Sequence, residues 1–128
     1  MASAESRTQA PPRRILVVED QSAAALSLRT ILLTDRHVVE IAENAETALT
    51  MFNASQYDLV ITDFKLARMD GLELAAAIKH HSSATPVFLV TAYLEQFTRN
   101  LPNIDLVLGK LFSVAEFQAA VRKALSTV

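Results

Sequence analysis

The sequence of 128 residues contains no cysteine, and this absence excludes several kinds of site at once. Without a thiol the chain can form no disulfide, no thiolate metal site and no cysteine nucleophile. No apolar run approaches the roughly 20 residues that a membrane-spanning helix needs. Met1–Arg14 also lacks the apolar stretch of a secretory signal. Together these absences favour a cytoplasmic protein without a membrane segment.

The chain also lacks a strong excess of charge of either sign. The chain has 12 Lys and Arg residues and 14 Asp and Glu residues, which gives a formal net charge of -2. A surface that binds nucleic acid or an anionic membrane usually shows a basic excess, so we expect neither partner. Hydrophobic residues make up 51% of the chain, enough for a core, and the length suits one domain.

Short apolar runs alternate with segments of helical spacing after a small, polar start that ends in a Pro-Pro pair. We expect residues 1–12 to form a flexible leader and residues 13–128 the folded domain. Because the sequence ends at Val128, directly after the last predicted helix, we expect no attached output domain. The predicted strands span residues 15–18, 37–42, 57–62, 86–90 and 104–108. The predicted helices span residues 22–34, 45–54, 71–78, 94–101 and 114–125.

This alternation predicts the α/β class, with a parallel sheet covered by helices on both faces. The strands are short and almost wholly apolar, as buried parallel strands are. Right-handed crossovers restrict the topology further. We therefore predict a flavodoxin-like, doubly wound five-stranded parallel sheet of order 2-1-3-4-5, with five helices.

Reactive side chains gather at the predicted carboxyl ends of the strands. The first strand ends in Glu19-Asp20, the third in Asp63, the fourth in Thr91 and the fifth in Lys110. In the order 2-1-3-4-5 these strands are neighbours, and ligands of open parallel sheets bind at that edge. We expect the five side chains to share one pocket.

The residue types in this pocket suit phosphoryl transfer. Three carboxylates repel one another unless a cation neutralises them, and Mg2+ favours a few carboxylates together with phosphate oxygens. Asp63 could then attack a phosphorus atom to give an aspartyl phosphate. The Lys110 ammonium and the Thr91 hydroxyl could hold the oxygens of the transferred group.

The chain resembles the receiver domains of two-component response regulators, in particular the stand-alone chemotaxis type. The resemblance covers about residues 13–125 and rests on the motifs ILVVED, LVITDF, MDGLEL, VTA and GKLF in this order. It implies that Asp63 is the phosphoacceptor and that Thr91 and Lys110 contact the phosphoryl group. For the metal it implies Mg2+ held by Glu19, Asp20, Asp63 and the backbone carbonyl of Lys65, with Asp20 a more direct ligand than Glu19.

The resemblance also implies a function as a signalling switch. Such a domain takes its phosphoryl group from a sensor histidine kinase, a histidine phosphotransfer protein or a small phosphodonor. It catalyses its own phosphorylation and dephosphorylation and is no enzyme for an external substrate. We expect it to act on an unknown downstream protein or to pass the phosphoryl group along a phosphorelay.

Four departures from the family pattern concern the parts that usually report phosphorylation. Leu66-Ala67 replaces Met-Pro, Val107 replaces an aromatic residue, Leu111 replaces a proline, and the segment from Thr91 to Lys110 is short. In the family pattern the corresponding Lys-Pro bond is cis. A cis bond costs only ~0.5–1 kcal/mol before proline but about 2.5–4 kcal/mol before leucine. We therefore expect a trans Lys110-Leu111 bond, with the long Lys110 side chain still reaching the acids.

The resemblance implies a switch in which an aromatic ring at the position of Val107 rotates inward when Thr91 moves. Val107 has no ring, so this rotation cannot operate here. We expect Tyr93 or Phe97 to replace it, or the short segment to shift as a whole, with the fourth helix and fifth strand forming the partner surface. These departures leave open an alternative, a pseudo-receiver that binds proteins independently of phosphorylation.

Two other functions compete on the same residues. Haloacid-dehalogenase-type phosphatases also use a strand-end aspartate with magnesium, but their second acid would stand where this chain has Lys65. A flavodoxin-like cofactor carrier would need a Ser/Thr/Gly-rich phosphate loop, which the strand-to-helix turns lack.

Several other residues are expected to have structural roles. Asp70-Gly71 indicates turn and capping chemistry, and Phe112 and Phe117 indicate core packing. The histidines are expected at the surface or with their hydrogen bonds satisfied: His37, His80 and His81.

Overall fold

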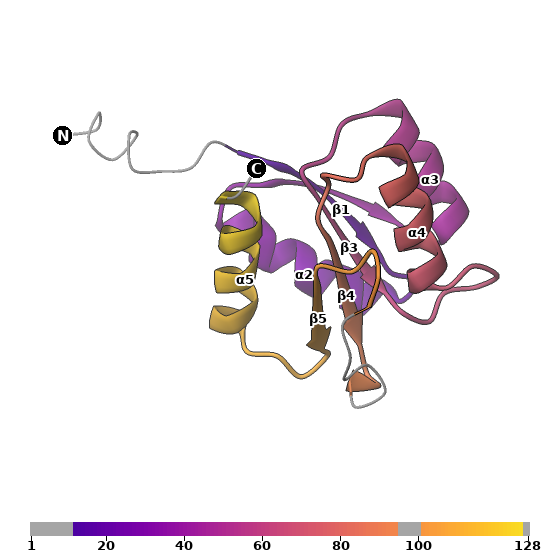
Figure 1. Ribbon diagram of the computed structural model, residues 1–128. Coiled ribbons are helices and arrows are strands. Elements are labelled where there is room, and N and C mark those ends of the chain that lie inside the picture. Colours follow the sequence, from indigo (N-terminus) through magenta and orange to yellow (C-terminus); the bar gives the residue numbers. More distant parts are fainter. Residues whose placement is uncertain (1–11, 95–100, 127–128) are drawn as a thin grey trace.

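The computed structural model describes residues 12–94 and 101–126, and within these ranges it contains five strands and four helices. Figure 1 shows the strands side by side in one sheet with helices on both of its faces. The strands are β1 (Arg14–Val18), β2 (Val38–Ala42), β3 (Leu59–Asp63), β4 (Val87–Thr91) and β5 (Leu106–Gly109). The helices are α2 (Ser22–Thr34), α3 (Ala45–Ala54), α4 (Gly71–His81) and α5 (Val114–Ser126).

The sheet has the order β2-β1-β3-β4-β5 and every neighbouring pair is parallel. The predicted fold class and strand order are therefore confirmed. The order reverses at β1, which pairs with β2 on one side and with β3 on the other. This reversal places the carboxyl ends of β1 and β3 side by side, where an open α/β sheet leaves room for a ligand.

Alternate residues of β1 enter two separate cores, because side chains along a strand point to opposite faces of the sheet. Ile15 and Val17 pack with residues of α2 and α5, such as Leu28 and Phe117. On the other face, Leu16 and Val18 pack with residues of α3 and α4. A strand buried on both faces must be apolar throughout, which explains the uninterrupted run at residues 15–18.

Three helices begin at the capping residues that the sequence indicates. The Asn44 side chain accepts a hydrogen bond from the Thr47 backbone at 2.7 Å. The Asp70 side chain accepts from the Glu73 backbone, while the Glu73 carboxylate accepts from the Asp70 backbone, a reciprocal capping box. Ser113 and Glu116 bond in the same reciprocal way before α5. These caps satisfy backbone donors that have no partner within the helix.

Helix α2 buries only some of its apolar side chains. Ala25, Leu28 and Leu32 face the core, whereas Leu26 and Leu33 are exposed.

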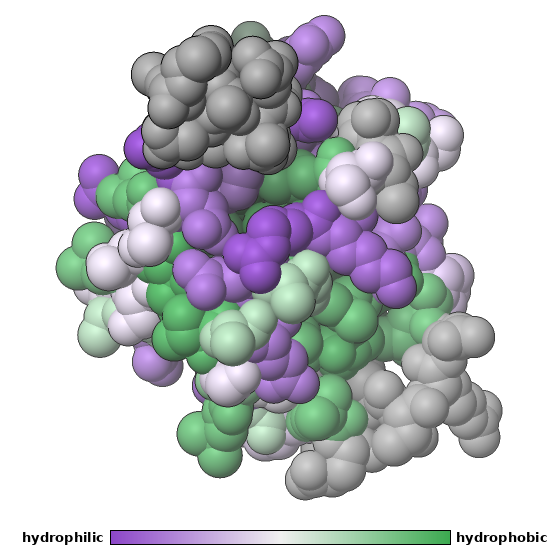
Figure 2. Space-filling view, turned by 90° about the vertical axis from the view of Figure 1, so that its left-hand side faces the viewer, coloured by the Kyte–Doolittle hydropathy of each residue, from purple (hydrophilic) through white to green (hydrophobic). Residues whose placement is uncertain are grey.

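Figure 2 shows a hydrophilic band across one side of the molecule, with hydrophobic residues reaching the surface below it. The predicted leader at residues 1–12 and the predicted helix at residues 94–101 lie almost wholly outside the described residues.

His37 corrects an expectation, because it is neither exposed nor satisfied. Only 7% of its surface is accessible, and neither ring nitrogen has a hydrogen-bond partner. Burial lowers the pKa of His37, against the opposing effect of the Asp35 carboxylate. The other two histidines lie on the surface, as expected. Among the described residues no helix combines the length and the apolar character that crossing a membrane requires.

Candidate functional site

Four neighbouring strands deliver polar side chains to one edge of the sheet. Glu19 and Asp20 follow β1, Asp63 ends β3, Thr91 ends β4, and Lys110 follows β5. The Lys110 backbone N–H donates to the Thr91 carbonyl at 2.9 Å, which continues the β4–β5 pairing to the site. Strand pairing therefore fixes the backbone on which these side chains stand.

Three carboxylates form a compact cluster at this edge. One oxygen from each of Glu19, Asp20 and Asp63 lies within 4.8 Å of the others. Their environments differ, because Glu19 is 3% exposed, Asp63 is 9% exposed and Asp20 stands in solvent. The Gln21 backbone N–H donates to Glu19 at 3.2 Å. Burial raises the pKa of Glu19, and the nearby charge of Asp63 raises it further, against the lowering effect of the Gln21 hydrogen bond.

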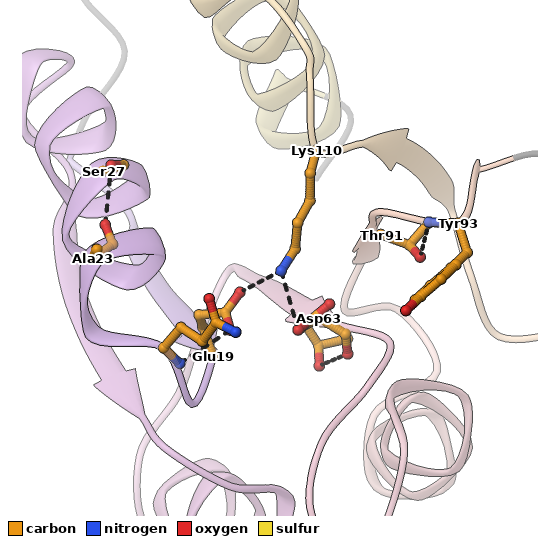
Figure 3. A network of polar contacts seen from close by, with 9 residues as sticks. Glu19, Ala23, Ser27, Asp63, Thr91, Tyr93 and Lys110 are labelled. Atoms are coloured by element: carbon orange, nitrogen blue, oxygen red, sulfur yellow. Dashed lines mark hydrogen bonds and ion pairs between the residues drawn. The ribbon is translucent and has the colours of Figure 1, made fainter.

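Lys110 places its ammonium between two of these acids. Its Nζ lies 3.3 Å from Glu19 Oε1 and 3.3 Å from Asp63 Oδ2. In Figure 3 its side chain extends from the end of β5 down to this pair. Burial lowers the pKa of Lys110, but the charges of Asp63 and Glu19 outweigh burial and the pKa is raised overall. The ammonium therefore stays charged and offsets part of the carboxylate repulsion.

The peptide bond that leads from Lys110 toward α5 has the conformation expected before Leu111. Every peptide bond in the described part of the chain is trans, so the predicted trans Lys110-Leu111 bond is present. The Leu111 side chain is fully exposed, at 101% of its reference area. The lysine nevertheless reaches both acids, as expected from its long, flexible stem.

A solvent-open pocket of about 270 Å³ lies beside the cluster and is lined by Asp20, Asp63, Lys65, Tyr93 and Lys110 among others. Thr91 is fully buried, and its hydroxyl accepts a hydrogen bond from the Tyr93 backbone at 2.9 Å. Figure 3 places this hydroxyl on the Tyr93 side of the site. Asp20, Asp63 and Lys110 thus line one pocket, whereas Glu19 and Thr91 are not among its lining residues and the Thr91 hydroxyl is engaged by the Tyr93 backbone.

The donor set of the cluster fits a hard divalent cation. Glu19, Asp20 and Asp63 offer carboxylate oxygens only, and Mg2+ prefers oxygen ligands and keeps several waters. The exposure of Asp20 leaves its carboxylate free to meet an ion that enters from solvent. Glu19 already bonds Lys110 and the Gln21 backbone. Asp20 is accordingly better placed than Glu19 as a direct ligand.

Two contacts at the site were not anticipated from the sequence. The start of α4 lies so close to β3 that a Cβ atom on Gly71 would stand 2.3 Å from the Asp63 carbonyl oxygen. The Lys65 ammonium lies over the Tyr93 ring, 5.5 Å from its centre. A glycine at the first position of a helix is a signal for the first contact. The second joins loops that are remote in sequence, and no local pattern indicates it.

Larger hollows occur elsewhere on the described surface but do not gather these groups. One of about 470 Å³ is lined by Lys79, Asp105 and other residues of α4 and the segment before β5. Lys79 Nζ lies 2.8 Å from Asp105, whose carboxylate also accepts from the Val87 backbone at 2.7 Å. These bonds hold the segment before β5 against β4 and α4, which is a structural role.

Comparison with known proteins identifies the family. The model of the response regulator receiver domain matches residues 15–122, so the chain belongs to this family. The chain is similar to the response regulator protein TrrA from Thermotoga maritima, whose crystal structure is a complex with Mg(2+)-BeF. The TM-score is 0.83 at 32% identity, over 88% of this chain and 99% of TrrA.

Curated relatives extend well beyond the matched region. The regulatory protein AtoC of Escherichia coli is 32% identical over 116 residues, which cover 88% of this chain and 25% of AtoC. The response regulator MprA of Mycolicibacterium vanbaalenii is 30% identical over 118 residues, covering 89% of this chain and 51% of MprA. The chain therefore spans from a quarter to about half of the length of these relatives.

Proposed function

We propose that this receiver domain is a phosphorylation-controlled switch and that Asp63 is its phosphoacceptor. The observation that carries the proposal is the position of Asp63 at the end of β3, beside Glu19 and Asp20 and 3.3 Å from the Lys110 ammonium. A carboxylate nucleophile needs neighbouring positive charge to approach an anionic phosphoryl group. Lys110 supplies one such charge, and a metal on the acids supplies the other.

The reaction forms one bond and breaks one bond at phosphorus. An Asp63 carboxylate oxygen attacks the phosphorus, and the bond from phosphorus to the donor breaks, a P–N bond in phosphohistidine or a P–O bond in acetyl phosphate. The electron pair of that bond leaves with the donor. Water later attacks the aspartyl phosphate, which returns the carboxylate and releases phosphate. The Lys110 ammonium holds an oxygen of the transferred group, and Thr91 holds another once its hydroxyl turns from Tyr93.

In this proposal Asp20, Asp63 and the Lys65 carbonyl hold Mg2+, with Glu19 supporting the site. When bound, the ion neutralises acids and phosphoryl oxygens as charge moves in the transition state. The relative TrrA, whose structure is a complex with Mg(2+)-BeF, supports this assignment. The chain's own residues orient the nucleophile, and the backbone contact between Gly71 N and the Phe64 carbonyl at 2.8 Å fixes the loop that follows Asp63.

The proposed phosphodonor is the phosphohistidine of a sensor kinase or of a phosphotransfer protein. We assign the receiver unit to residues 13–128, with residues 1–12 as a leader. It signals by binding a downstream protein or by passing the phosphoryl group on. It is a switch that turns over no external substrate, and the place of action is the cytoplasm.

A pseudo-receiver that works without phosphate is the second candidate. It is favoured by the unusual sequence from Tyr93 to Leu111, in which Leu111 is fully exposed and Val107, within β5, offers no ring. Such a protein would keep the fold and bind partners equally well with and without a phosphodonor.

Intact mass spectrometry after incubation with acetyl phosphate and Mg2+ separates these functions. We expect one added phosphoryl group in the wild type and none in Asp63→Asn. The label should be strongly reduced in Asp20→Ala, less so in Glu19→Ala, and absent in excess chelator. Asp70→Asn is the matched control, because it lies outside the pocket and asparagine also caps helices. An unlabelled wild type would favour the pseudo-receiver, and steady turnover of a phosphate monoester would favour a phosphatase.

A further inference from the structure

Tyr93 is held by two residues that both stand at the phosphoacceptor site. The Lys65 ammonium lies over its ring, 5.5 Å from the ring centre, and its backbone N–H donates a hydrogen bond to the Thr91 hydroxyl at 2.9 Å. Lys65 lies two residues after Asp63, and Thr91 ends the neighbouring strand β4. Tyr93 and Lys65 line the same pocket as Asp63, and the Tyr93 side chain is 39% exposed. Anything that draws Lys65 and Thr91 into the pocket must therefore change the environment of Tyr93.

The charge around Asp63 shows why Lys65 would move. The Lys110 ammonium already forms ion pairs with both Glu19 and Asp63. Lys65 is exposed, and it forms no ion pair with an acid among the described residues. Its contact with the Tyr93 ring is a cation–π interaction at a solvent-exposed position, which is weak. Lys65 is thus a cation that lines the pocket and is bound to the Tyr93 ring by a weak cation–π interaction.

Phosphorylation changes the charge at Asp63 sharply. A carboxylate with one negative charge becomes a group with nearly two, and three phosphoryl oxygens project toward the pocket. Hydrogen bonds between an ammonium and a phosphoryl oxygen are among the stronger ones that proteins form. The phosphoryl group therefore competes effectively with the Tyr93 ring for Lys65. If Thr91 rotates to donate to the same group, its bond with the Tyr93 backbone is lost as well.

We propose that Tyr93 is the residue through which this receiver reports phosphorylation. In the unphosphorylated state the Lys65 ammonium holds its ring and the Thr91 hydroxyl holds its backbone. Phosphorylation of Asp63 withdraws Lys65 and Thr91 toward the phosphoryl group, and the Tyr93 ring is released to solvent and to partners. Val107 has no ring that could serve instead. This inference rests on the proposed function, because it requires a phosphoryl group on Asp63.

The chain offers a direct probe, since Tyr57 and Tyr93 are its two tyrosines and it contains no tryptophan. Biosynthetic labelling with fluorotyrosine gives two fluorine NMR signals, which Tyr93→Phe assigns. Tyr57 is buried before the start of β3, at the opposite end of that strand from Asp63, and serves as an internal reference. The signals are recorded with Mg2+ before and after acetyl phosphate, and intact mass measures phosphorylation of the same samples.

Four variants test the Lys65 contact with the Tyr93 ring. In the wild type we expect the Tyr93 signal to shift on phosphorylation while the Tyr57 signal stays in place. In Lys65→Met the Tyr93 signal should lie near its phosphorylated position before any phosphodonor is added, and should lose most of its response. Lys65→Arg keeps a cation over the ring and should restore the response. Lys123→Met removes an exposed lysine on α5 and should behave as the wild type, and Asp63→Asn should show no shift.

The outcomes separate this inference from the proposed function. A chain that gains the phosphoryl mass while the Tyr93 signal stays in place overturns the inference alone. A Lys65→Met variant that responds like the wild type overturns it too, because the contact is then without effect. Absence of the phosphoryl mass in the wild type overturns both the proposed function and the inference.

Discussion

Replacing Gly71 with alanine tests how α4 is held against the end of β3. A Cβ atom at this position would stand 2.3 Å from the Asp63 carbonyl oxygen, 2.9 Å from Leu89 Cδ1 and 3.1 Å from Phe64 Cα. The Leu89 side chain can rotate, but the two backbone atoms cannot move without moving β3. The start of α4 must therefore retreat by about 1 Å to reach ordinary contact distances.

The magnitude follows from three effects. An extra methyl group in a tightly packed place costs about 1–3 kcal/mol. Loss of the hydrogen bond from Gly71 N to the Phe64 carbonyl adds about 1 kcal/mol. Alanine is the better helix former and returns up to about 1 kcal/mol. We expect Gly71→Ala to lower the free energy of unfolding by about 1–3 kcal/mol. Phosphorylation of Asp63 should slow by about tenfold or more, because small displacements of a nucleophile are costly.

Gly109→Ala is the matched control, because the three atoms nearest to a Cβ there all belong to the Leu94 side chain, at 3.1 Å or more. The far end of a leucine can turn away, so we expect little change in stability. Urea unfolding measures the free energy, and intact mass against time in acetyl phosphate measures the rate. A Gly71→Ala protein as stable as Gly109→Ala would refute the close-approach argument.

Three further predictions concern residues away from the pocket. Asp70→Ala removes the capping box of α4 and should cost about 1 kcal/mol in urea unfolding, whereas Asp70→Asn should cost less; equal losses would contradict the cap. Burial raises the pKa of Tyr57 to about 12, and its hydroxyl donates to Glu40. Tyrosinate absorbance should show this late titration and lose it in Tyr57→Phe. Burial keeps the pKa of His37 below its unfolded value, so the unfolded state binds the proton more readily. Stability should therefore fall as the pH drops below about 6.5, and less so in His37→Gln, with His80→Gln as the exposed control; parallel losses in all three proteins would oppose this reasoning.

Local signals in the sequence account for the elements and for the kind of site. Apolar runs mark the strands because parallel strands are buried on both faces. Asn44, Asp70 and Ser113 mark helix starts because a side-chain oxygen satisfies the free backbone donors. Once the strand order is known, the acids after β1 and β3 must share one edge, because parallel strands end on the same side. These inferences need only neighbours along the chain and the rules of parallel sheets.

The tertiary structure decided which of these residues touch and which are buried. Leu28 enters the core while Leu26 is exposed, because packing against the sheet sets the rotation of α2, and both are leucines in an apolar helix. His37, in the turn between α2 and β2, is buried with no hydrogen-bond partner for either ring nitrogen, although its backbone N–H donates to the Leu32 carbonyl. Lys65 meets the Tyr93 ring only because separate crossovers bring two loops to one pocket mouth. Such contacts join residues far apart in sequence, and their geometry depends on the packing of the whole sheet rather than on any local pattern.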